Sequence, residues 1–313
     1  MTPVEAIVGG LFGWALVRRL IPGRRSRFLV GCWWDVTESR TRRDWTLFRQ
    51  HLVECDVNEV CVMVNDQTDG PYPWTQWTAE GLEWMAAECG KLGISFSIMV
   101  WPRPSPDHIE ALLAGPVALA AKHGWPVEYD VETFNWQASR LRGYATLDAA
   151  ADELVRRTRA AGVRVVGSTT YPFGVGSSAF MGVIKRSDYC AVQAYSVNRN
   201  SDPQYAPGAA FGPGRMQLVA AERMQRFAPH VRFVCGLAAY GQTWPGVDRD
   251  ATMAAAFVAA TNVGAASVRF WSAKHFLGPN RNSYAWRFIH RRRKMRAIGE
   301  RALAEFGVDL GQA

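Results

Sequence analysis

Three acidic residues at alternate positions, Glu128, Asp130 and Glu132, are the part of this 313-residue sequence best suited to chemistry. In an extended strand every second side chain points to the same face, so the three carboxyl groups should share one face. Carboxylates that lie this close together cannot all ionise at neutral pH, and the pKa of at least one is raised. A carboxyl group with a raised pKa can act as a general acid, so we predict proton-transfer chemistry at this strand.

Strand-like and helix-like segments alternate on both sides of this stretch. Helical spacing follows at residues 45–53, 82–89, 106–122, 147–161, 216–227 and 252–261, with a basic last helix at 286–306 and the weakest helical pattern between the fifth and sixth strands. Apolar runs typical of buried strands occur at residues 28–35, 59–66, 94–101, 127–132, 163–169, 189–195, 232–240 and 267–271.

This alternation predicts an α/β fold, a single (β/α)8 TIM barrel. An open doubly wound sheet is the alternative, but the first strand ends in Trp33-Trp34-Asp35 and not in a glycine-rich phosphate loop. We expect an apolar and basic N-terminal segment at 1–27, a catalytic barrel at 28–280 and a basic C-terminal helix at 281–313 that completes the barrel.

The N-terminal segment carries an apolar run that is shorter than a membrane span, which needs about 20 residues. We interpret this run either as a helix packed on the protein or a partner, or as a membrane-associated segment.

In a barrel of this kind the C-terminal ends of the strands form the active site. Aromatic, carboxylate and amide side chains gather at these ends. Pyranose faces stack on aromatic rings, and sugar hydroxyls need polar partners, so the set indicates a sugar site, although each aromatic ring alone could simply plug the barrel. The predicted substrate-binding residues are Trp33, Asp66, Trp101, Trp136, Gln193, Tyr240 and Trp271.

Arg269 lies two residues before Trp271 on the last strand, so the two side chains should face the same way. If Trp271 points into the barrel, Arg269 does too, and it would pair with Glu128, the deepest of the three acids. We predict a structural Arg269–Glu128 pair that leaves Asp130 and Glu132 free for chemistry.

At these positions the sequence resembles the family-18 chitinases, barrel enzymes that cleave N-acetylhexosamine polymers. Glu128-Tyr129-Asp130-Val131-Glu132 stands where that family ends its fourth strand in Asp-x-Asp-x-Glu, with Glu128 replacing the first Asp. The resemblance implies that Glu132 is the general acid and that Asp130 orients the acetamido group of the substrate. It also implies that Tyr195 assists and that Trp271 forms the floor of the sugar site.

The sequence is also similar to the family-25 lysozymes, many of them from phages, which cut bacterial peptidoglycan. Asp130-Val131-Glu132 matches their Asp-x-Glu on a barrel strand, and Asp35 matches an Asp on their first strand. The catalytic residues that we predict are therefore Glu132, Asp130, Tyr195 and Asp35.

For the mechanism, we expect Asp130 and the surrounding aromatic rings to raise the pKa of Glu132, which then protonates the leaving oxygen. The acetamido oxygen of the substrate attacks if no second carboxylate lies roughly 5 Å across the bond; otherwise Asp35 or Asp66 acts. We thus predict an endo-acting glycosidase for peptidoglycan (lysozyme- or endolysin-like) or chitin. The alternative is a non-catalytic glycan-binding barrel that forms part of a larger phage or envelope assembly.

The formal charge of +8 is concentrated in residues 1–27 and 281–313, while the middle of the chain is nearly neutral. Basic ends suit an anionic membrane or protein partner, or are solvated helix faces; nucleic acid is not expected, since no aromatic-rich groove accompanies them.

The six cysteines form no CxxC pair and indicate buried free thiols. We expect synthesis in a reducing cytoplasm, action at the bacterial cell envelope, and neither a cofactor nor a metal, because the histidines form no cluster.

Overall fold

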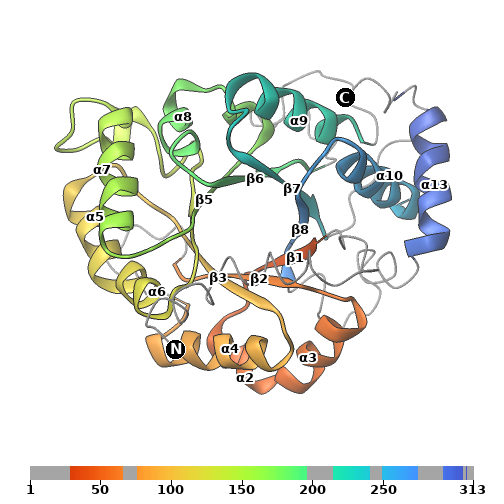
Figure 1. Ribbon diagram of the computed structural model, residues 1–313, viewed down its shortest axis with the longest axis horizontal. Coiled ribbons are helices and arrows are strands. Elements are labelled where there is room, and N and C mark those ends of the chain that lie inside the picture. Colours follow the sequence, from red (N-terminus) through yellow and green to blue (C-terminus); the bar gives the residue numbers. More distant parts are fainter. Residues whose placement is uncertain are drawn as a thin grey trace, which may run out of the picture.

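The computed structural model describes residues 29–65, 76–195, 214–239, 249–273, 292–305 and 308. Its strands are all parallel and close into an eight-stranded barrel, with β8 paired to β1 (Figure 1). This closed sheet confirms the predicted (β/α)8 barrel. The strands are β1 (Leu29–Trp34), β2 (Glu59–Met63), β3 (Ser95–Val100), β4 (Val127–Asp130), β5 (Val166–Thr170), β6 (Tyr189–Gln193), β7 (Arg232–Ala238) and β8 (Ser267–Trp271).

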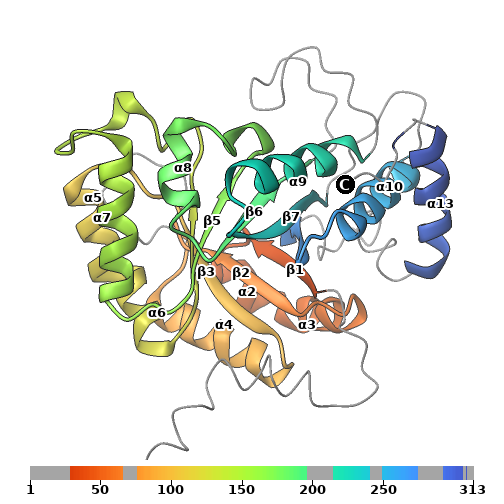
Figure 2. The ribbon, with the colours of Figure 1, turned by 45° about the horizontal axis from the view of Figure 1, so that its top comes forward.

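Helices surround the barrel on its outer side (Figures 1 and 2). A short α8 occupies the link between β5 and β6, and the sequence pattern does not predict α2. In the described part of the chain the helices are α2 (Glu38–Arg43), α3 (Trp45–Glu54), α4 (Ala79–Lys91), α5 (Pro106–Leu112), η1 (Leu113–Val117), α6 (Ala118–His123), η2 (Ala138–Arg140), α7 (Leu147–Ala160), η3 (Pro172–Gly174), α8 (Ser178–Ile184), α9 (Arg215–Phe227), α10 (Arg249–Asn262) and α13 (Arg292–Glu305).

The segment after β3 departs from its predicted form, a single helix over 106–122. The structure divides it into α5, η1 and α6. Gly115 has φ −104° and ψ −106°, outside the helical range, and Pro116 follows it. Proline lacks a backbone N–H and clashes with the preceding turn, so the helix kinks at this point.

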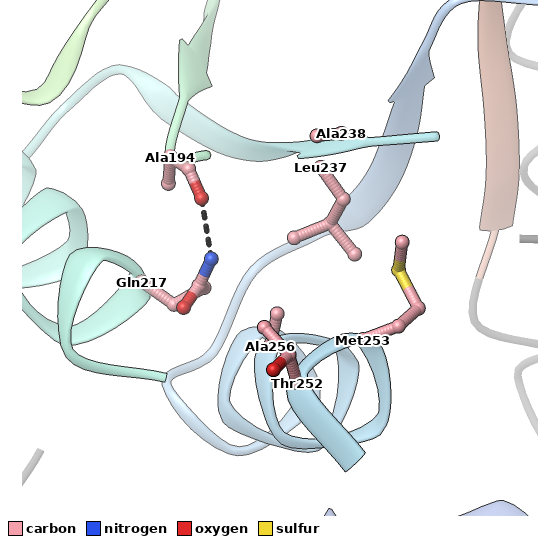
Figure 3. Close-up of a pocket in the computed structure, with 7 residues that line it drawn as sticks. All are labelled: Ala194, Gln217, Leu237, Ala238, Thr252, Met253 and Ala256. Carbon is pink, nitrogen blue, oxygen red and sulfur yellow. Dashed lines mark hydrogen bonds between the residues drawn. The ribbon is translucent and has the colours of Figure 1, made fainter. Parts of the chain in front are cut away.

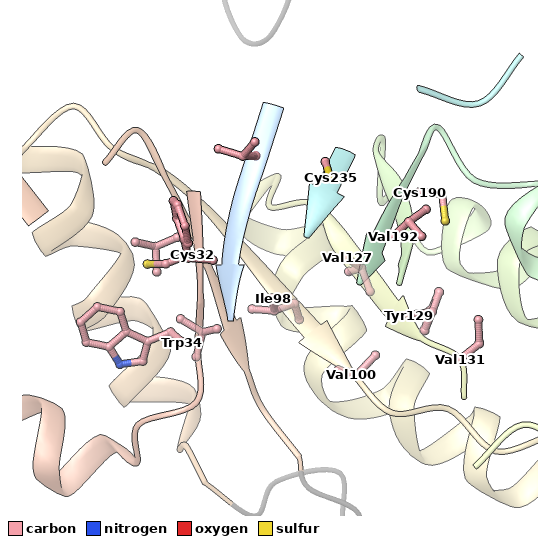
Figure 4. Packing of buried hydrophobic residues seen from close by; sticks show 14 of the residues in the cluster. Cys32, Trp34, Ile98, Val100, Val127, Tyr129, Val131, Cys190, Val192 and Cys235 are labelled. Carbon is pink, nitrogen blue, oxygen red and sulfur yellow. The ribbon is translucent and has the colours of Figure 1, made fainter. Parts of the chain in front are cut away.

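Alternating strand residues divide the core into two layers. Figure 4 shows Trp34, Tyr129 and other labelled side chains pointing from the strands toward the surrounding helices, where they join one large apolar cluster. The residues between them point into the lumen, where Trp33, Met99 and Tyr189 belong to a second, smaller cluster. The period of two along each strand therefore decides which side chains can reach a site inside the barrel.

Glycines make room for the largest lumen side chains. A Cβ on Gly167 would lie 2.2 Å from the ring of Tyr189, and a Cβ on Gly236 would lie 2.8 Å from the ring of Trp33. A Cβ on Gly31 would lie 3.1 Å from a carboxyl oxygen of Glu59. The lumen is thus filled by a few large side chains set against bare backbone.

The C-terminal helix α13 packs on the outer side of α10 (Figure 1). Leu303 and Ala302 contact the apolar cluster that contains Val258 and Ala255 of α10. The basic last helix of the sequence prediction is therefore present within 292–305. The six cysteines are buried and free, which confirms that prediction.

Several predictions concern parts of the chain outside the described residues. These include the apolar and basic segment 1–27, the domain boundary near residue 280, and a long loop at 197–213 that we interpret as a lid or subsite wall. Asp66 and Tyr240 also lie there. No helix in the described ranges combines the length and the apolar character needed to cross a bilayer.

We expect Gly167→Ala to destabilise the barrel by about 1–3 kcal/mol, because the added methyl group overlaps the buried ring of Tyr189. Denaturation in urea gives the free energy of unfolding. Gly90→Ala is the matched control: nothing lies within 4 Å of its Cβ position in α4, and it should stabilise the protein by up to about 1 kcal/mol. Equal free energies of unfolding for the two variants would show that the Tyr189 ring moves aside without loss of stability.

Candidate active site

Strand β4 presents its three acids at three depths of the lumen. Glu128 and Asp130 lie on β4 and Glu132 follows it, while Tyr129 and Val131 pack in the outer cluster. The relative exposure rises from 0% for Glu128 to 1% for Asp130 and 7% for Glu132. The alternation therefore forms a row of three carboxyl groups that ends at the barrel mouth.

Glu128, the deepest acid of this row, accepts from three donors. Trp33 donates its indole N–H to Oε1 at 2.7 Å, the Thr169 hydroxyl donates to the same oxygen, and Arg269 forms an ion pair with Oε2. The guanidinium of Arg269 also donates to Glu59 Oε1 at 2.6 Å. Arg269 thus bridges two carboxylates, and the pairing with Glu128 is the one that the strand alternation predicts.

The environment of Arg269 keeps it charged although it is fully buried. Burial by itself lowers its pKa, but the carboxylates of Glu128 and Glu59 outweigh this and raise the pKa well above its ordinary value. The guanidinium also lies 5.3 Å from the ring centre of Trp33 and 5.5 Å from that of Tyr189. Such contacts add attraction between a cation and the ring faces.

Asp130 and Glu132 are joined by one amide group. Gln193, the last residue of β6, lies with its Nε2 2.7 Å from Glu132 Oε1 and 3.5 Å from Asp130 Oδ1. Burial, and then the charges of Glu132 and Glu128, raise the pKa of Asp130 well above its ordinary value. Asp130 is the deeper member of the pair, and the raised pKa of Glu132 stays a prediction.

Two asparagines hold the backbone where the strands end, and the predicted site does not include them. Asn135 accepts from the Glu132 N–H at 2.7 Å and donates to the Asp130 carbonyl at 2.5 Å. Asn65 accepts from the Trp101 N–H at 2.8 Å and donates to the Trp101 carbonyl at 3.3 Å. Asn135 binds backbone of its own segment, whereas Asn65 binds the segment that follows the neighbouring strand β3.

Aromatic rings flank the acids at the mouth. Trp101 is stacked on Phe134 with ring centres 4.5 Å apart, and Trp271 meets Trp33 edge to face at 6.0 Å. Trp271 is partly exposed, and Tyr195 lies buried just beyond β6. Trp101 and Trp271 stay predicted substrate-binding residues.

Two predicted substrate-binding residues require correction. Trp33 is 0% exposed because it lies one step below the mouth, with its N–H bound to Glu128 and its ring against Gly236. Trp136 is also 0% exposed and packs in the outer cluster with the helices. Neither ring presents a face to a ligand. Asp35 follows β1 directly, is partly exposed, and stays a predicted site residue.

The described part of the chain also forms hollows outside the lumen. A cavity of about 10 Å³ lies behind β6 and β7, where Gln217 donates to the Ala194 carbonyl (Figure 3); this is room for about one water molecule. An open groove of about 910 Å³ lies where α2 and α4 begin. No three His, Cys, Asp or Glu side chains of the described ranges gather as a metal site.

No family model and no curated protein sequence matches this chain, but solved structures resemble it. A chitinase from Bacteroides thetaiotaomicron superposes with a TM-score of 0.58 at 11% identity, over 85% of this chain and 96% of the chitinase. A glycoside hydrolase family 5 enzyme from Prevotella bryantii B14 gives 0.55 at 12% identity, over 88% and 95%.

An exo-β-1,4-mannosidase from Opitutaceae bacterium strain TAV5 gives a TM-score of 0.57 at 15% identity. The match covers 88% of this chain but only 60% of that longer protein. At such identities the likeness establishes the shared barrel fold. The three neighbours named here are described as a chitinase, a glycoside hydrolase family 5 enzyme and a mannosidase.

We expect Arg269→Met to lower the free energy of unfolding by about 3–5 kcal/mol, because Glu128 would stay buried without its counter-charge. Urea denaturation at neutral pH measures the loss. The double variant Arg269→Met/Glu128→Gln also removes the unpaired buried charge and should recover part of the lost stability. An Arg269→Met protein with an unchanged midpoint would contradict the pairing as a structural element.

The raised pKa of Asp130 predicts how stability depends on pH. Above a pH of about 3.8 an unfolded aspartate has lost its proton, whereas folded Asp130 still binds one. The folded state binds more protons in this window, so stability falls as the pH rises toward the raised pKa. Asp130→Asn, which mimics the protonated form, should remove this fall, and the variant's advantage should grow with pH in a series of denaturation curves. A parallel pH dependence in both proteins would refute it.

Proposed function

We propose that this chain is a glycoside hydrolase that cleaves a polymer of 2-acetamido sugars, peptidoglycan or chitin, with Glu132 as the general acid. One observation carries the proposal: Asp130 and Glu132 share the amide of Gln193 at the mouth of the barrel, and the pKa of Asp130 is raised. Two carboxyl groups bound to the same amide, with different environments, form an arrangement that can hold a proton and deliver it.

The acid pair acts as one titrating unit that shares a proton between its members. The outer member, Glu132, gives this proton to the glycosidic oxygen as the bond from that oxygen to the sugar carbon breaks. Asp130 and Glu132 then both carry negative charge, directly below a ring that has become positive. This attraction exists only as the bond breaks, so it lowers the barrier instead of tightening substrate binding.

The nucleophile is inferred from what faces the pair. Strand β7 ends in Gly236-Leu237-Ala238, followed by Ala239, and none of these side chains is a carboxylate. Among the residues that the sequence places at strand ends, Asp35 and Asp66 are the candidates for an opposing carboxylate. We favour attack by the acetamido oxygen of the substrate, with Asp130 as its partner; water then opens the resulting ring and returns a proton to Glu132.

The structural neighbours support hydrolysis of a glycan, and one of them is described as a chitinase. Others are described as acting on mannan or glucan chains, for example a family 113 β-1,4-mannanase and a broad-specificity endoglucanase. Preference for an acetamido sugar therefore rests on the acids of β4 and on Trp271, and peptidoglycan rests on the basic ends of the chain. These ends would suit action at an anionic bacterial envelope after synthesis in the cytoplasm.

We expect Glu132→Gln to abolish release of reducing ends from chitin oligomers or purified peptidoglycan, with rates at least about 100-fold below the wild type. Binding of the same oligomers, measured by calorimetry, should persist because the amide keeps the shape of the acid. Glu305→Gln, on an exposed position of α13, is the control and should keep full activity. A wild type that binds these glycans but is as inert as Glu132→Gln would favour a non-catalytic glycan-binding barrel.

A further inference from the structure

The β-ladder ends before it reaches the general acid. Between β3 and β4 the register stops at Val100 and Tyr129, and between β4 and β5 it stops at Asp130 and Thr169. One more bond runs from the Val131 N–H to the Thr169 carbonyl at 2.9 Å. Glu132 therefore lies beyond the strand, where sheet pairing no longer fixes the direction of its side chain.

The side chain of Asn135 takes over at this point. Its Oδ1 accepts from the Glu132 N–H at 2.7 Å and its Nδ2 donates to the Asp130 carbonyl at 2.5 Å. One partner is a donor and the other an acceptor, so the carboxamide fits in only one orientation. The group is buried and spans the backbone on both sides of Val131. It thereby fixes the peptide units that aim Glu132 and Asp130 at the mouth.

The Glu132 carbonyl is held from the same turn. It accepts from the Asn135 N–H at 3.2 Å and from the Trp136 N–H at 2.9 Å. Trp136 is wholly buried among the helices, so the turn is anchored in the outer core. Asn135 thus connects the acid pair to a turn that is anchored outside the lumen. It can hold the pair in place without touching a ligand.

We propose that Asn135 is a positioning residue for the acid pair: through the backbone of Asp130 and Glu132 it sets the angle at which Glu132 meets the glycosidic oxygen. The proposal rests on the proposed function for its catalytic consequence, and on the hydrogen bonds alone for its geometry. Proton transfer requires donor and acceptor at hydrogen-bond distance, and a shift of about 1 Å can cost about 100-fold in rate.

A similar asparagine at the other end of the barrel provides a matched control. Asn58 lies just before β2 and accepts from the Val30 N–H at 3.1 Å, near the start of β1. Like Asn135 it holds backbone at the end of a strand, but it does so on the side of the barrel away from the acids. Asn58→Ala removes a comparable bond without a path to Glu132.

The kinetic experiment compares Asn135→Ala with Asn58→Ala on whichever glycan the wild type cleaves. We expect Asn135→Ala to lower kcat by about 10- to 100-fold with KM changed less than about threefold, since the aromatic wall is intact. Asn58→Ala should lower the melting temperature but keep kcat. Equal losses of kcat in the two variants, or an unchanged kcat in Asn135→Ala, would reduce Asn135 to a stability role.

A second readout does not need a substrate. Infrared difference spectra report the carbonyl stretch of protonated Asp130, assigned by its disappearance in Asp130→Asn. The charged groups that face Asp130 are Glu132 and Glu128. Once Glu132 is released and water enters, the titration midpoint of this band should fall in Asn135→Ala and stay at the wild-type value in Asn58→Ala. An unchanged midpoint in Asn135→Ala overturns the proposal.

These two readouts separate the possible failures. If no glycan is cleaved but the infrared midpoint falls in Asn135→Ala alone, the proposed function is wrong and the positioning role stands. If Asn135→Ala does not fold, Asn135→Asp replaces it: this variant keeps the size and the accepting oxygen but loses the donor to Asp130. It should show the same fall in kcat and a displaced infrared midpoint, and wild-type values for both would overturn the proposal.

Discussion

The buried ion pair of Arg269 with Glu128 is the constraint around which the lumen is built. Removing two charges from water is costly, and their attraction offsets this cost only if the remaining hydrogen-bonding groups find partners. Trp33 and Thr169 supply these partners for Glu128, and Glu59 supplies one for Arg269. This arrangement fills the floor of the barrel with large side chains, which explains why bare glycine backbone lies against several of them.

The same strand that contributes to this floor also carries the acids that we propose for proton transfer. Successive acids on one strand face are separated by about 6.6 Å, so each meets a different environment. Glu128 lies against a cation, Asp130 is buried beside like charges, and Glu132 is closest to the mouth. One repeating pattern therefore places three carboxyl groups in three different environments. This difference allows one acid to hold its proton while another is ion-paired.

The period of two along the strands was sufficient to predict the fold, the shared face of the acids and the inward Arg269. Contacts that cross the barrel were not predictable, because spacing along a strand says nothing about which residue faces it from another. Glu59 was missed for this reason, and Trp33 was placed too high because its depth depends on the gap at Gly236. Asn135 binds its own segment, but its place in a loop does not say which backbone groups it meets. The kink at Pro116 was not predicted either, although glycine and proline stand together there in the sequence.

The acids at the mouth are held by carboxamides, while the cation lies one step deeper. A positive side chain beside Asp130 would lower its pKa and remove the proton that the proposed mechanism requires. Gln193 and Asn135 donate hydrogen bonds without adding charge, so they fix the geometry of Asp130 and Glu132 and leave their proton in place. Arg269 instead forms ion pairs with Glu128 and Glu59. Charge and position are thus set by different residues, and a change in one need not disturb the other.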